Sequence, residues 1–329
     1  MEFLKDKTIL ITGGTGSFGK SFTKFLLENS TAQKIIIFSR DEYKQFHMAN
    51  ELRQFENRLR FFIGDIRDIE RLERAFEKVD IVIHAAALKQ VPAIEYNPQE
   101  AIKTNVIGSQ NIVEAALNKK VGKVLLISTD KAAQPANLYG ATKLCAEKLF
   151  TNSNSYSSDR KTKFSAVRYG NVIGSRGSVI EKFLNKDIKK IEITHPEMTR
   201  FWITLKQSFN LVLFALENME GGEIFIPKIP SMKITDLFKV ITPNAEQKII
   251  GIRPGEKLHE TLLTKEESKH GYEMEKYYVI IPESEKNINP IFSKYETIGS
   301  KLNTSFRFTS NHNSEWLTSE KLREIIQEI

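Results

Sequence analysis

The chain has 329 residues, of which 40% are hydrophobic, and its 48 basic and 41 acidic residues give a formal net charge of +7. That length and composition are typical of a globular protein with a sizeable core, built as one large domain or two closely associated ones. The basic residues are spread along the chain among acids, which argues against nucleic acid and favours a small polyanionic ligand. No apolar run approaches the roughly 18 residues of a membrane span, so we expect no membrane partner and a cytoplasmic protein.

Cysteine and histidine usage points away from disulfides and metals. Cys145 is the single cysteine, which excludes an internal disulfide, and its place in the apolar helical pattern LCAEKLF predicts a buried packing role. The six histidines show no HxxxH spacing, and no CxxC spacing occurs. We therefore expect no metal site.

Short apolar runs alternate with helical patterns over the first 170 residues. These runs are continuous rather than alternating, which is typical of strands buried on both faces, and the segments between them are long enough for crossover helices. The pattern predicts an α/β fold with a Rossmann-type doubly wound parallel sheet. The predicted strands lie at 8–12, 34–38, 59–64, 80–86, 123–128 and 164–170.

The rhythm changes after residue 170, where segments such as GGEIFIPKIPSMKITDLF and GIRPGEKLHETLL indicate a smaller mixed α/β region. We expect a Rossmann domain over residues 1–170, completed by 197–228. Residues 171–329 are expected to form mainly a substrate-binding region.

The C-terminal part is expected to hold an arm and a helix. Residues 283–315 have few apolar clusters, which predicts an extended surface arm. Thr318 is a plausible N-cap for a final helix. One face of this helix carries an apolar stripe that we expect to dock on the core, formed by Leu322, Ile325, Ile326 and Ile329.

A glycine-rich turn, TGGTGSFGK, follows the first predicted strand. Glycines allow a tight turn and a close approach of the backbone to a pyrophosphate, whose charge then meets the N–H groups of the following helix. A strand before and an amphipathic segment after the turn favour a dinucleotide site over simple turn chemistry. The residues expected to contact the cofactor here are Gly13, Thr15, Gly16, Ser17, Phe18 and Gly19.

The second predicted strand ends in FSRDEYK, which bears on the choice between NAD and NADP. Ser39, Arg40 and Lys44 suit a ribose 2′-phosphate, whereas Asp41 could instead hold a 2′-hydroxyl. We expect NADP. The third strand closes on Asp65 and Ile66; the Asp65 carboxylate could bind the adenine amino group, or cap the next helix.

Tyr139 and Lys143 are four residues apart on a predicted helix, so their side chains share one face. A nearby ammonium favours an ionised phenol, which makes a tyrosine a candidate base near neutral pH. A YxxxK pair alone is common in helices. Here it follows a dinucleotide turn and a strand that ends in Ser128-Thr129, which makes a catalytic role the better interpretation.

At these residues the sequence resembles the extended short-chain dehydrogenase/reductase superfamily, and closely its inverting UDP-N-acetylglucosamine 4,6-dehydratases, which start pseudaminic acid synthesis. The resemblance spans most of residues 3–282 and includes HAAALKQVPAIEYNP, STDKAA, RYGNVIGSRGSV and MTRFWIT. Its most specific part is Thr129-Asp130-Lys131, since retaining 4,6-dehydratases carry Asp-Glu there and 4-epimerases have neither group.

The resemblance implies roles for individual residues. Tyr139, supported by Lys143 and Thr129, would remove the C4 hydroxyl proton while hydride passes to the nicotinamide. Lys131 would take the C5 proton and Asp130 would protonate the departing C6 hydroxyl. For this, we expect the pKa of Lys131 to be lowered by burial beside cationic groups, and Asp130 to hold a proton, favoured by burial and opposed by neighbouring ammonium groups.

The resemblance also implies ligand contacts and an assembly. Lys89 and Asn171 would face the substrate, Arg200 and Arg253 would neutralise the UDP pyrophosphate, and the partner would be UDP-N-acetylglucosamine, bound by a homo-oligomer (dimer or hexamer). Ala85 and Val172 join the expected cofactor contacts. His84 is expected to be a packed, hydrogen-bonded histidine rather than a catalyst.

Three other functions remain open from the sequence. A UDP-sugar 4-epimerase would return the hydride to C4. A capsule-type 4,6-dehydratase/5-epimerase resembles this chain as well, although many such enzymes have Met in place of Tyr139. A non-catalytic NADP-sensing module would need the glycine turn and no Asp-Lys pair.

Overall fold

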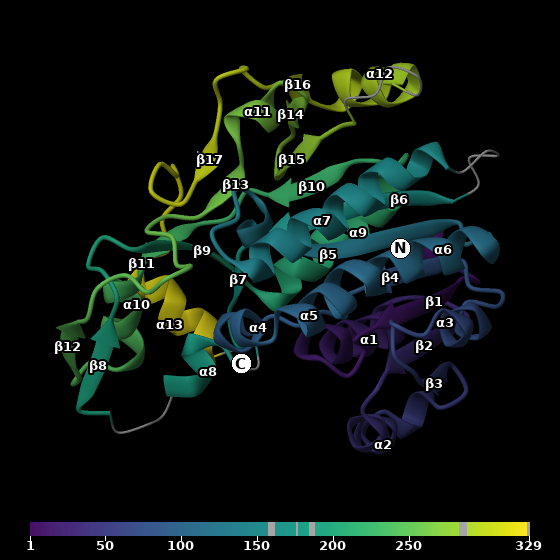
Figure 1. The fold of residues 1–329 in the computed structure, drawn as a ribbon, viewed down its shortest axis with the longest axis horizontal. Helices are drawn as coiled ribbons and strands as arrows, with labels where there is room; N and C mark the ends of the chain where they lie inside the picture. Colours follow the sequence, from purple (N-terminus) through teal and green to yellow (C-terminus); the bar gives the residue numbers. More distant parts are fainter. Residues whose placement is uncertain (157–161, 176, 184–187, 283–287, 328–329) are drawn as a thin grey trace.

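The computed structural model describes residues 1–156, 162–175, 177–183, 188–282 and 288–327. Its main feature is a ten-stranded sheet in the order β16-β14-β15-β10-β6-β5-β4-β1-β2-β3 (Figure 1). The strands from β3 across to β10 are parallel, and β15, β14 and β16 add an antiparallel edge. These ten strands are β1 Thr8–Thr12, β2 Lys34–Ser39, β3 Leu59–Ile63, β4 Ile81–His84, β5 Lys123–Thr129, β6 Lys163–Tyr169, β10 Ile224–Pro227, β14 Gly271–Glu273, β15 Tyr277–Ile280 and β16 Ser300–Lys301.

Helices cover both faces of this sheet. On one face α1 contacts α9, which packs on β5, β6 and β10; on the other, α3, α6 and α7 pack side by side. Both faces are covered because the central strands are nearly all buried Ile, Val and Leu. The helices of this part are α1 Ser17–Asn29, α2 Glu42–Glu51, α3 Ile69–Ala75, α4 Val91–Tyr96, α5 Pro98–Ala101, α6 Gly108–Asn118, α7 Leu138–Asn152 and α9 Leu205–Asn218.

The predicted doubly wound α/β fold is confirmed. The order β3-β2-β1-β4-β5-β6 reverses direction between β1 and β4, and ligands of such sheets bind outside the carboxyl ends of the strands at this switch point. Each of the six predicted strands is present within a few residues of its expected bounds. Short non-α turns join these elements: η1 Glu2–Leu4, η2 Arg53–Phe55, the π-helical η3 Ile102–Ile107, η4 Asp130–Ala132 and η5 Ser153–Ser155.

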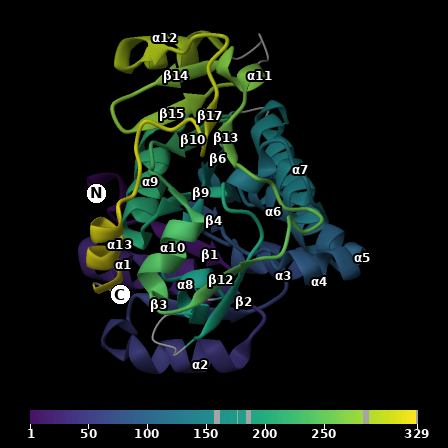
Figure 2. The ribbon, with the colours of Figure 1, turned by 90° about the vertical axis from the view of Figure 1, so that its left-hand side faces the viewer.

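A smaller second region lies beside the carboxyl ends of the central strands (Figure 2). It has its own apolar core, which includes Trp202, Met232, Phe238 and Leu322. Its small sheets are β11-β9-β7, β12-β8 and β13-β17. The elements are β7 Asn171–Val172, α8 Val179–Phe183, β8 Lys190–Ile193, β9 Thr199–Ile203, β11 Ser231–Lys233, α10 Ile234–Ile241, β12 Glu246–Ile249, β13 Thr261–Leu263, α11 Lys265–Ser268, β17 Phe308–Thr309 and α13 Ser319–Gln327.

The final helix, α13, is placed as expected. The Thr318 hydroxyl accepts from the backbone N–H of Lys321 at 3.2 Å, which makes Thr318 its N-cap. Leu322 is buried in the second core, and Ile325 and Ile326 pack against it. Ile329 lies outside the described residues.

The prediction of an extended surface arm over residues 283–315 is wrong for the part of this range that the structure describes. Residues 288–298 form a helix, α12 (Ile288–Ile298), followed by β16 and β17. Ile291, Tyr295, Leu302 and Phe308 are buried in the main core. Within α12, Ile291, Tyr295 and Ile298 recur at the i, i+4 and i+7 spacing of a helix, a periodicity that the polar composition of the whole range obscured. Residues 283–287 lie outside the described part.

The prediction that Cys145 is buried is wrong, because this residue is exposed. The buried stripe of α7 runs through Lys143, Ala146, Glu147 and Phe150, so it contains two ionisable groups. Apolar periodicity alone therefore assigned the wrong face to the cysteine.

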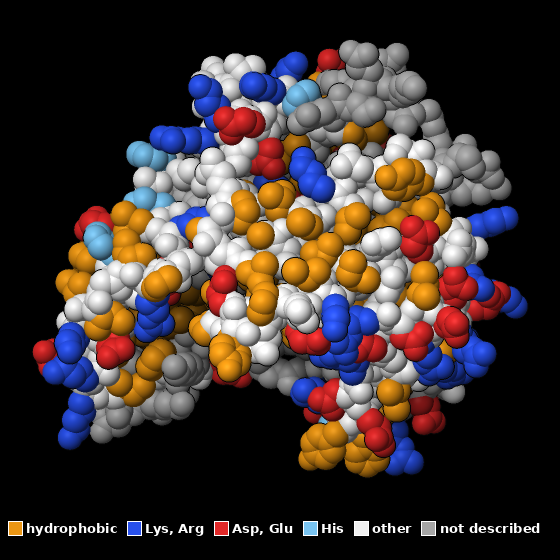
Figure 3. Space-filling model, viewed as in Figure 1, with side chains coloured by type: hydrophobic (Ala, Val, Ile, Leu, Met, Phe, Trp, Pro, Cys, Tyr) orange, Lys and Arg blue, Asp and Glu red, His pale blue; other side chains and the backbone are white. Residues whose placement is uncertain are grey.

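The surface agrees with the interleaved charges of the sequence. Figure 3 shows Lys and Arg side chains interspersed with Asp and Glu over the face drawn there. Among the described residues, no helix is long and apolar enough to cross a membrane. The same part of the chain contains no group of three or more His, Cys, Asp or Glu residues placed to hold a metal ion.

Candidate active site

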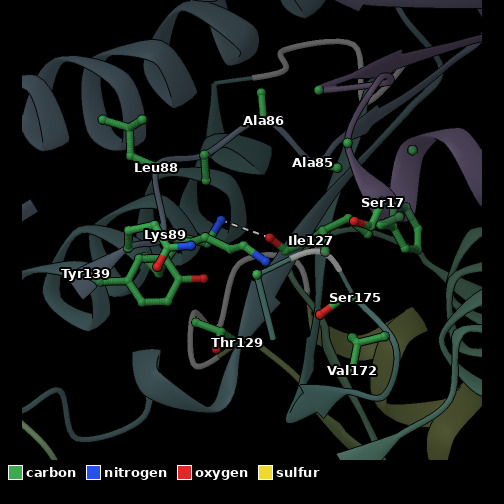
Figure 4. Close-up of a pocket in the computed structure, with 18 of the residues that line it drawn as sticks. Ser17, Ala85, Ala86, Leu88, Lys89, Ile127, Thr129, Tyr139, Val172 and Ser175 are labelled. Carbon is green, nitrogen blue, oxygen red and sulfur yellow. Dashed lines mark hydrogen bonds between the residues drawn. The ribbon is translucent and has the colours of Figure 1, made fainter. Parts of the chain in front are cut away.

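A cavity of about 1080 Å³ lies at the carboxyl ends of β1, β2, β4, β5 and β6. Every residue expected to contact the cofactor lines it, and so do Thr129, Lys131, Lys89 and Asn171. Figure 4 shows Tyr139, Thr129 and Lys89 on one side of this cavity and Ser17 on the other. The cavity therefore joins the glycine turn to the Ser-Thr-Asp-Lys segment, which are more than 100 residues apart in the sequence.

The glycine turn is packed too closely for side chains. Gly13 has a φ of +64°, and a Cβ added there would lie 2.8 Å from the Cα of Ala86. At Gly19 a Cβ would lie 2.6 Å from the Cα of Gly14, so α1 meets the turn in direct backbone contact. The N-cap of α1 is Gly16, which offers no side-chain cap, so the first turn of the helix is available to an anion. This cradle fits a dinucleotide pyrophosphate.

The FSRDEYK segment at the end of β2 was expected to contact the ribose 2′ position of the cofactor. Asp41 is the N-cap of α2: Oδ1 accepts from the Lys44 backbone N–H at 2.9 Å and Oδ2 pairs with Lys44 Nζ at 2.5 Å. Gln45 Nε2 holds Ser39 through its carbonyl and its hydroxyl, each at 3.0 Å. Asp41 is thus engaged within its own helix turn, and Ser39 and Arg40 line the cavity beside it.

Asp65 is an ion-pair partner in the cavity wall. Its Oδ2 accepts from Arg67 Nη2 at 2.7 Å and lies 3.6 Å from Arg40 Nη1. Burial opposes ionisation, but the hydrogen bonds and charges of Arg67 and Arg40 outweigh it and lower the pKa of Asp65. The alternative role as a helix cap is wrong, because Asp68 caps α3. Ile66 is buried beside it.

The candidate catalytic residues come from three consecutive elements. Thr129 ends β5, Asp130 and Lys131 form the first turn of η4, and Tyr139 and Lys143 lie in α7. The Thr129 hydroxyl donates to Asp130 Oδ1 at 3.0 Å and is a hydrogen-bond partner of the Tyr139 hydroxyl. Lys143 Nζ donates to the Ile127 carbonyl at 2.8 Å, the contact dashed in Figure 4.

Asp130 is fully buried. Its Oδ1 accepts from Thr129 and from Lys131 Nζ, each at 3.0 Å, whereas its Oδ2 has no hydrogen-bond partner among the described residues. Burial raises the pKa of Asp130, and the nearby Glu260 adds to the effect, against the opposing charge of Lys131. The expectation that burial favours a proton on Asp130 is confirmed.

Lys131 is held between three oxygen atoms. Its Nζ lies 3.0 Å from Asp130 Oδ1, 3.3 Å from Asn171 Oδ1 and 3.5 Å from Glu260 Oε1. Burial lowers the pKa of Lys131, but the negative charges of Asp130 and Glu260 outweigh burial and raise it above its ordinary value. The expected lowering of the Lys131 pKa is therefore wrong for the protein alone, because a second carboxylate faces the amine.

The pKa values of the Tyr-Lys pair also differ from expectation. Burial raises the pKa of Tyr139, and the charge of Asp130 adds to this, while Lys131 and the Thr129 hydrogen bond act in the opposite direction. The predicted ease of ionisation is therefore wrong for the protein alone. Burial lowers the pKa of Lys143 to about 8, with Glu147 opposing.

The expected substrate residues separate into two groups. Lys89 and Asn171 line the cavity, whereas Arg200 and Arg253 are not part of its wall. Arg200 is buried, and its guanidinium donates to the carbonyls of Thr199 and Leu258 and lies 3.7 Å from Glu260 Oε1. Arg253 is exposed in the loop before β13.

Sequence reasoning missed several polar groups at this site. Glu260 precedes β13 and is buried against Lys131. Thr104 and Ser128 line the cavity, and their buried hydroxyls have no hydrogen-bond partner among the described residues. Glu260 stands in the quoted segment GIRPGEKLHE, where a carboxylate next to an apolar run was the available signal.

His84 is structural, as expected. It is buried at the end of β4, its Nδ1 lies 2.7 Å from the Thr12 hydroxyl, and its Nε2 lies 3.2 Å from the Ser109 hydroxyl. The ring also stacks on Phe150. Both ring nitrogens are thus engaged away from the cavity.

A glycine cradle at the switch point of this sheet, with a Tyr-Lys helix facing it, defines an enzyme of the extended short-chain dehydrogenase/reductase type. Residues 9–282 match the family described as polysaccharide biosynthesis protein. The chain belongs to this family, and its resemblance to inverting UDP-N-acetylglucosamine 4,6-dehydratases is confirmed at high identity.

Three relatives illustrate the match. A protein of Campylobacter jejuni named UDP-N-acetylglucosamine 4,6-dehydratase (inverting) is 51% identical, over 97% of both chains. A protein of Rickettsia felis named UDP-glucose 4-epimerase is 42% identical, over 98% of this chain and 95% of the other. The solved structure of Pen from Bacillus thuringiensis is 38% identical, with a TM-score of 0.89 over 99% of this chain and 100% of the other.

Proposed function

We propose that this protein is a hydro-lyase that dehydrates UDP-N-acetylglucosamine across C5 and C6 after oxidation at C4, with inversion at C5. The product is UDP-2-acetamido-2,6-dideoxy-β-L-arabino-hex-4-ulose. The observation that carries the proposal is the buried Asp130 carboxyl beside the Lys131 amine, in the turn η4 between β5 and the Tyr139 helix, with Lys131 lining the same cavity as the glycine turn. A simple oxidoreductase or epimerase needs no such acid-base pair.

The cofactor is proposed to be NADP. The engaged state of Asp41 and the position of Arg40 near Ser39 support a 2′-phosphate rather than a 2′-hydroxyl. When bound, this cofactor would accept hydride from C4 of the sugar and return it to C6. Gly13, Gly16 and the N-terminus of α1 would hold its pyrophosphate.

The first step needs a base for the C4 hydroxyl. Tyr139 lines the cavity, and its oxygen would take that proton in the ionised form of the side chain, after the phenol has released its own proton. The resulting ketone acidifies the C5 hydrogen. Lys143 lies four residues after Tyr139 on α7, and its Nζ donates to the Ile127 carbonyl. Its pKa of about 8 allows it to gain or release a proton close to neutral pH.

The second step is the elimination of water. Lys131 Nζ, in its neutral form, takes the proton from C5, the C5–C6 double bond forms, and the C6 hydroxyl leaves as water after receiving a proton from Asp130. Asp130 suits this role because its pKa is raised and its Oδ2 lacks another partner among the described residues. With hydride returned to C6, a proton reaching C5 from the face away from Lys131 inverts that carbon.

The proposal also covers the substrate contacts, the oligomeric state, the location in the cell and the pathway. Lys89 and Asn171 would bind the sugar, since both line the cavity near Lys131. Arg200 and Arg253 would reach the UDP pyrophosphate only after their side chains move from the positions described above. From the resemblance, we propose a cytoplasmic homo-oligomer whose product enters pseudaminic acid synthesis, with residues 1–170 and 197–228 binding the cofactor and 171–329 mainly the substrate.

The test is incubation of the purified protein with UDP-N-acetylglucosamine in deuterated water, followed by NMR. A new C6 methyl group with deuterium at C5 supports the proposal. A galacto product without deuterium identifies a 4-epimerase, the alternative that the Rickettsia felis relative's name favours. Absence of turnover with bound cofactor would favour a sensing module, and further conversion at C5 a dehydratase/5-epimerase.

A further inference from the structure

Glu260 places a second buried carboxylate beside the Lys131 amine. Its carboxylate is only 3% exposed. Oε1 lies 3.5 Å from Lys131 Nζ and 3.7 Å from Arg200 Nε, and Oε2 lies 3.5 Å from Lys257 Nζ. One buried carboxylate thus faces three cations, one of which is the proposed C5 base.

The backbone of Glu260 is fixed by the segment that follows β17. Ser310 is fully buried; its N–H donates to the Glu260 carbonyl at 2.8 Å and its Oγ accepts from the Glu260 N–H at 2.9 Å. The same Oγ lies 2.6 Å from the Thr199 hydroxyl, next to Arg200 on β9. The SNHNSEWL segment therefore joins Glu260, just before β13, to the strand that carries Arg200, which gives the C-terminal region a part in the site.

The charged groups around Lys131 indicate which carboxylate balances its ammonium group. The titratable groups that interact with the amine are Asp130 on η4, Arg200 on β9, Tyr139 on α7, Lys257 in the loop before β13, and Glu260 itself. Asp130 is fully buried, and burial favours its neutral form. Glu260 is then the anion that balances the ammonium group.

We propose that Glu260 is a positioning residue that holds the Lys131 amine beside Asp130 and Asn171 and keeps it protonated in the enzyme without substrate. The inference rests on the proposed function for its catalytic meaning, while the contact itself is independent of that function. Glu260 acts through Lys131 and sets the pH at which this amine becomes a base.

The direct test is competitive labelling of lysines with trace acetic anhydride from pH 6 to 11, because only a neutral amine reacts. The protein is used with its bound cofactor, and the peptide containing Lys131 is quantified by mass spectrometry. Glu260→Gln removes the anion and keeps the shape, so Lys131 should take up about tenfold more label at pH 8. Glu266→Gln, on the exposed face of α11, is the matched control and should label as the wild type.

Ser310→Ala is the second variant, in case Glu260→Gln does not fold. It loosens Glu260 without changing any charge, so labelling of Lys131 should rise in the same direction by about twofold. Glu260→Asp retains the charge and should restore most of the protection. Equal labelling of Lys131 in wild type and in Glu260→Gln would overturn the proposal.

Turnover separates this inference from the proposed function. In Glu260→Gln, the rise of kcat/KM with pH for C5 deuterium exchange should begin at lower pH, and kcat should fall more than KM changes. A shift in labelling without turnover in the wild type would support the Glu260 contact and reject the proposed function. A pH profile identical to wild type, with unchanged labelling, would reject the role of Glu260.

Discussion

The Asn105 side chain makes two hydrogen bonds to the backbone of Leu88. Its Oδ1 accepts from the Leu88 N–H at 2.8 Å and its Nδ2 donates to the Leu88 carbonyl at 2.9 Å, while Nδ2 also donates to Thr142 Oγ1 at 3.0 Å. Asn105 lies in the π-helical segment Ile102–Ile107, a local irregularity of the kind often found at functional sites. It thereby ties the loop that carries Lys89 to the helix that carries Tyr139.

Asn105→Ala should loosen this loop. Three hydrogen bonds of a buried side chain are lost, so the free energy of unfolding should fall by about 1–3 kcal/mol, and KM for the sugar nucleotide should rise because Lys89 is less well placed. Denaturant unfolding and steady-state kinetics measure the two effects. Asn118→Ala is the control, since that side chain makes an exposed contact with Glu73; equal effects of both variants would contradict this positioning role.

Arg40→Ala should change cofactor preference. Without the guanidinium, the affinity for NADPH should fall about tenfold or more, because a charge-assisted contact to the 2′-phosphate is lost. The affinity for NADH should stay the same. Fluorescence titration of both nucleotides provides the measurement, with the exposed Arg53→Ala as control. Equal losses for the two cofactors would show that Arg40 does not read the 2′ position.

Asp130→Asn should separate the two halves of the reaction. Asparagine keeps an oxygen acceptor for Thr129 and Lys131 but cannot release a proton to the C6 hydroxyl. We expect C5 deuterium exchange to persist while formation of the C6 methyl group falls by about 10²–10⁴-fold. NMR of the products in deuterated water reports both. Asp236→Asn, on the exposed surface of α10, is the control.

Lys131→Ala should have the complementary effect. Cofactor binding should be retained, because the glycine cradle and Ser39-Arg40 are untouched, but C5 exchange should be lost together with dehydration. Isothermal titration with NADPH and the same NMR assay check the two statements. Full dehydration by this variant would remove Lys131 from the proposed role.

The features that could be predicted from the sequence depend on patterns of neighbouring residues. Each central strand is a continuous apolar run, and the glycine turn and YxxxK helix follow such runs directly, so the parallel sheet and the dinucleotide turn could be predicted. The parts that were missed depend on contacts distant in sequence. Glu260 acts on Lys131 from 129 positions away, and Tyr295 on α12 is buried in the main core by contacts with residues distant in sequence. The predicted lowering of the Lys131 pKa was wrong for the same reason, because Glu260 is distant in the sequence.

Glu147→Ala should cost far more stability than a surface ion pair. Arg168 and Glu147 are both buried, Arg168 Nη2 donates to Glu147 Oε2 at 2.6 Å, and Glu267 Oε1 lies 2.8 Å from the same Nη2. Removing Glu147 leaves a buried guanidinium with one carboxylate, Glu267, and the Leu262 carbonyl, which should lower the free energy of unfolding by about 3–5 kcal/mol. Glu77→Ala, from the exposed pair with Lys119, should change it by less than about 1 kcal/mol. Similar losses would contradict this assignment.

The neutral state of His84 predicts how stability depends on pH. Burial, with the nearby charge of Lys143, lowers the pKa of His84 to about 3, whereas an unfolded histidine titrates near 6.5. The unfolded chain therefore takes up a proton below pH 6.5 that the folded protein refuses. This contribution to stability is complete above pH 6.5 and is lost as the pH falls toward 3, at about 1.4 kcal/mol per pH unit.

His84→Gln removes that proton uptake and should flatten the pH dependence of the unfolding free energy between pH 6 and 5 by about this amount, although the variant is less stable at pH 7. Urea unfolding at several pH values gives the slope. His47→Gln, at an exposed position on α2, should leave the slope as it is in the wild type. A wild-type slope in His84→Gln would mean that another group takes up the proton and that His84 is not held neutral by its burial between β4 and α7.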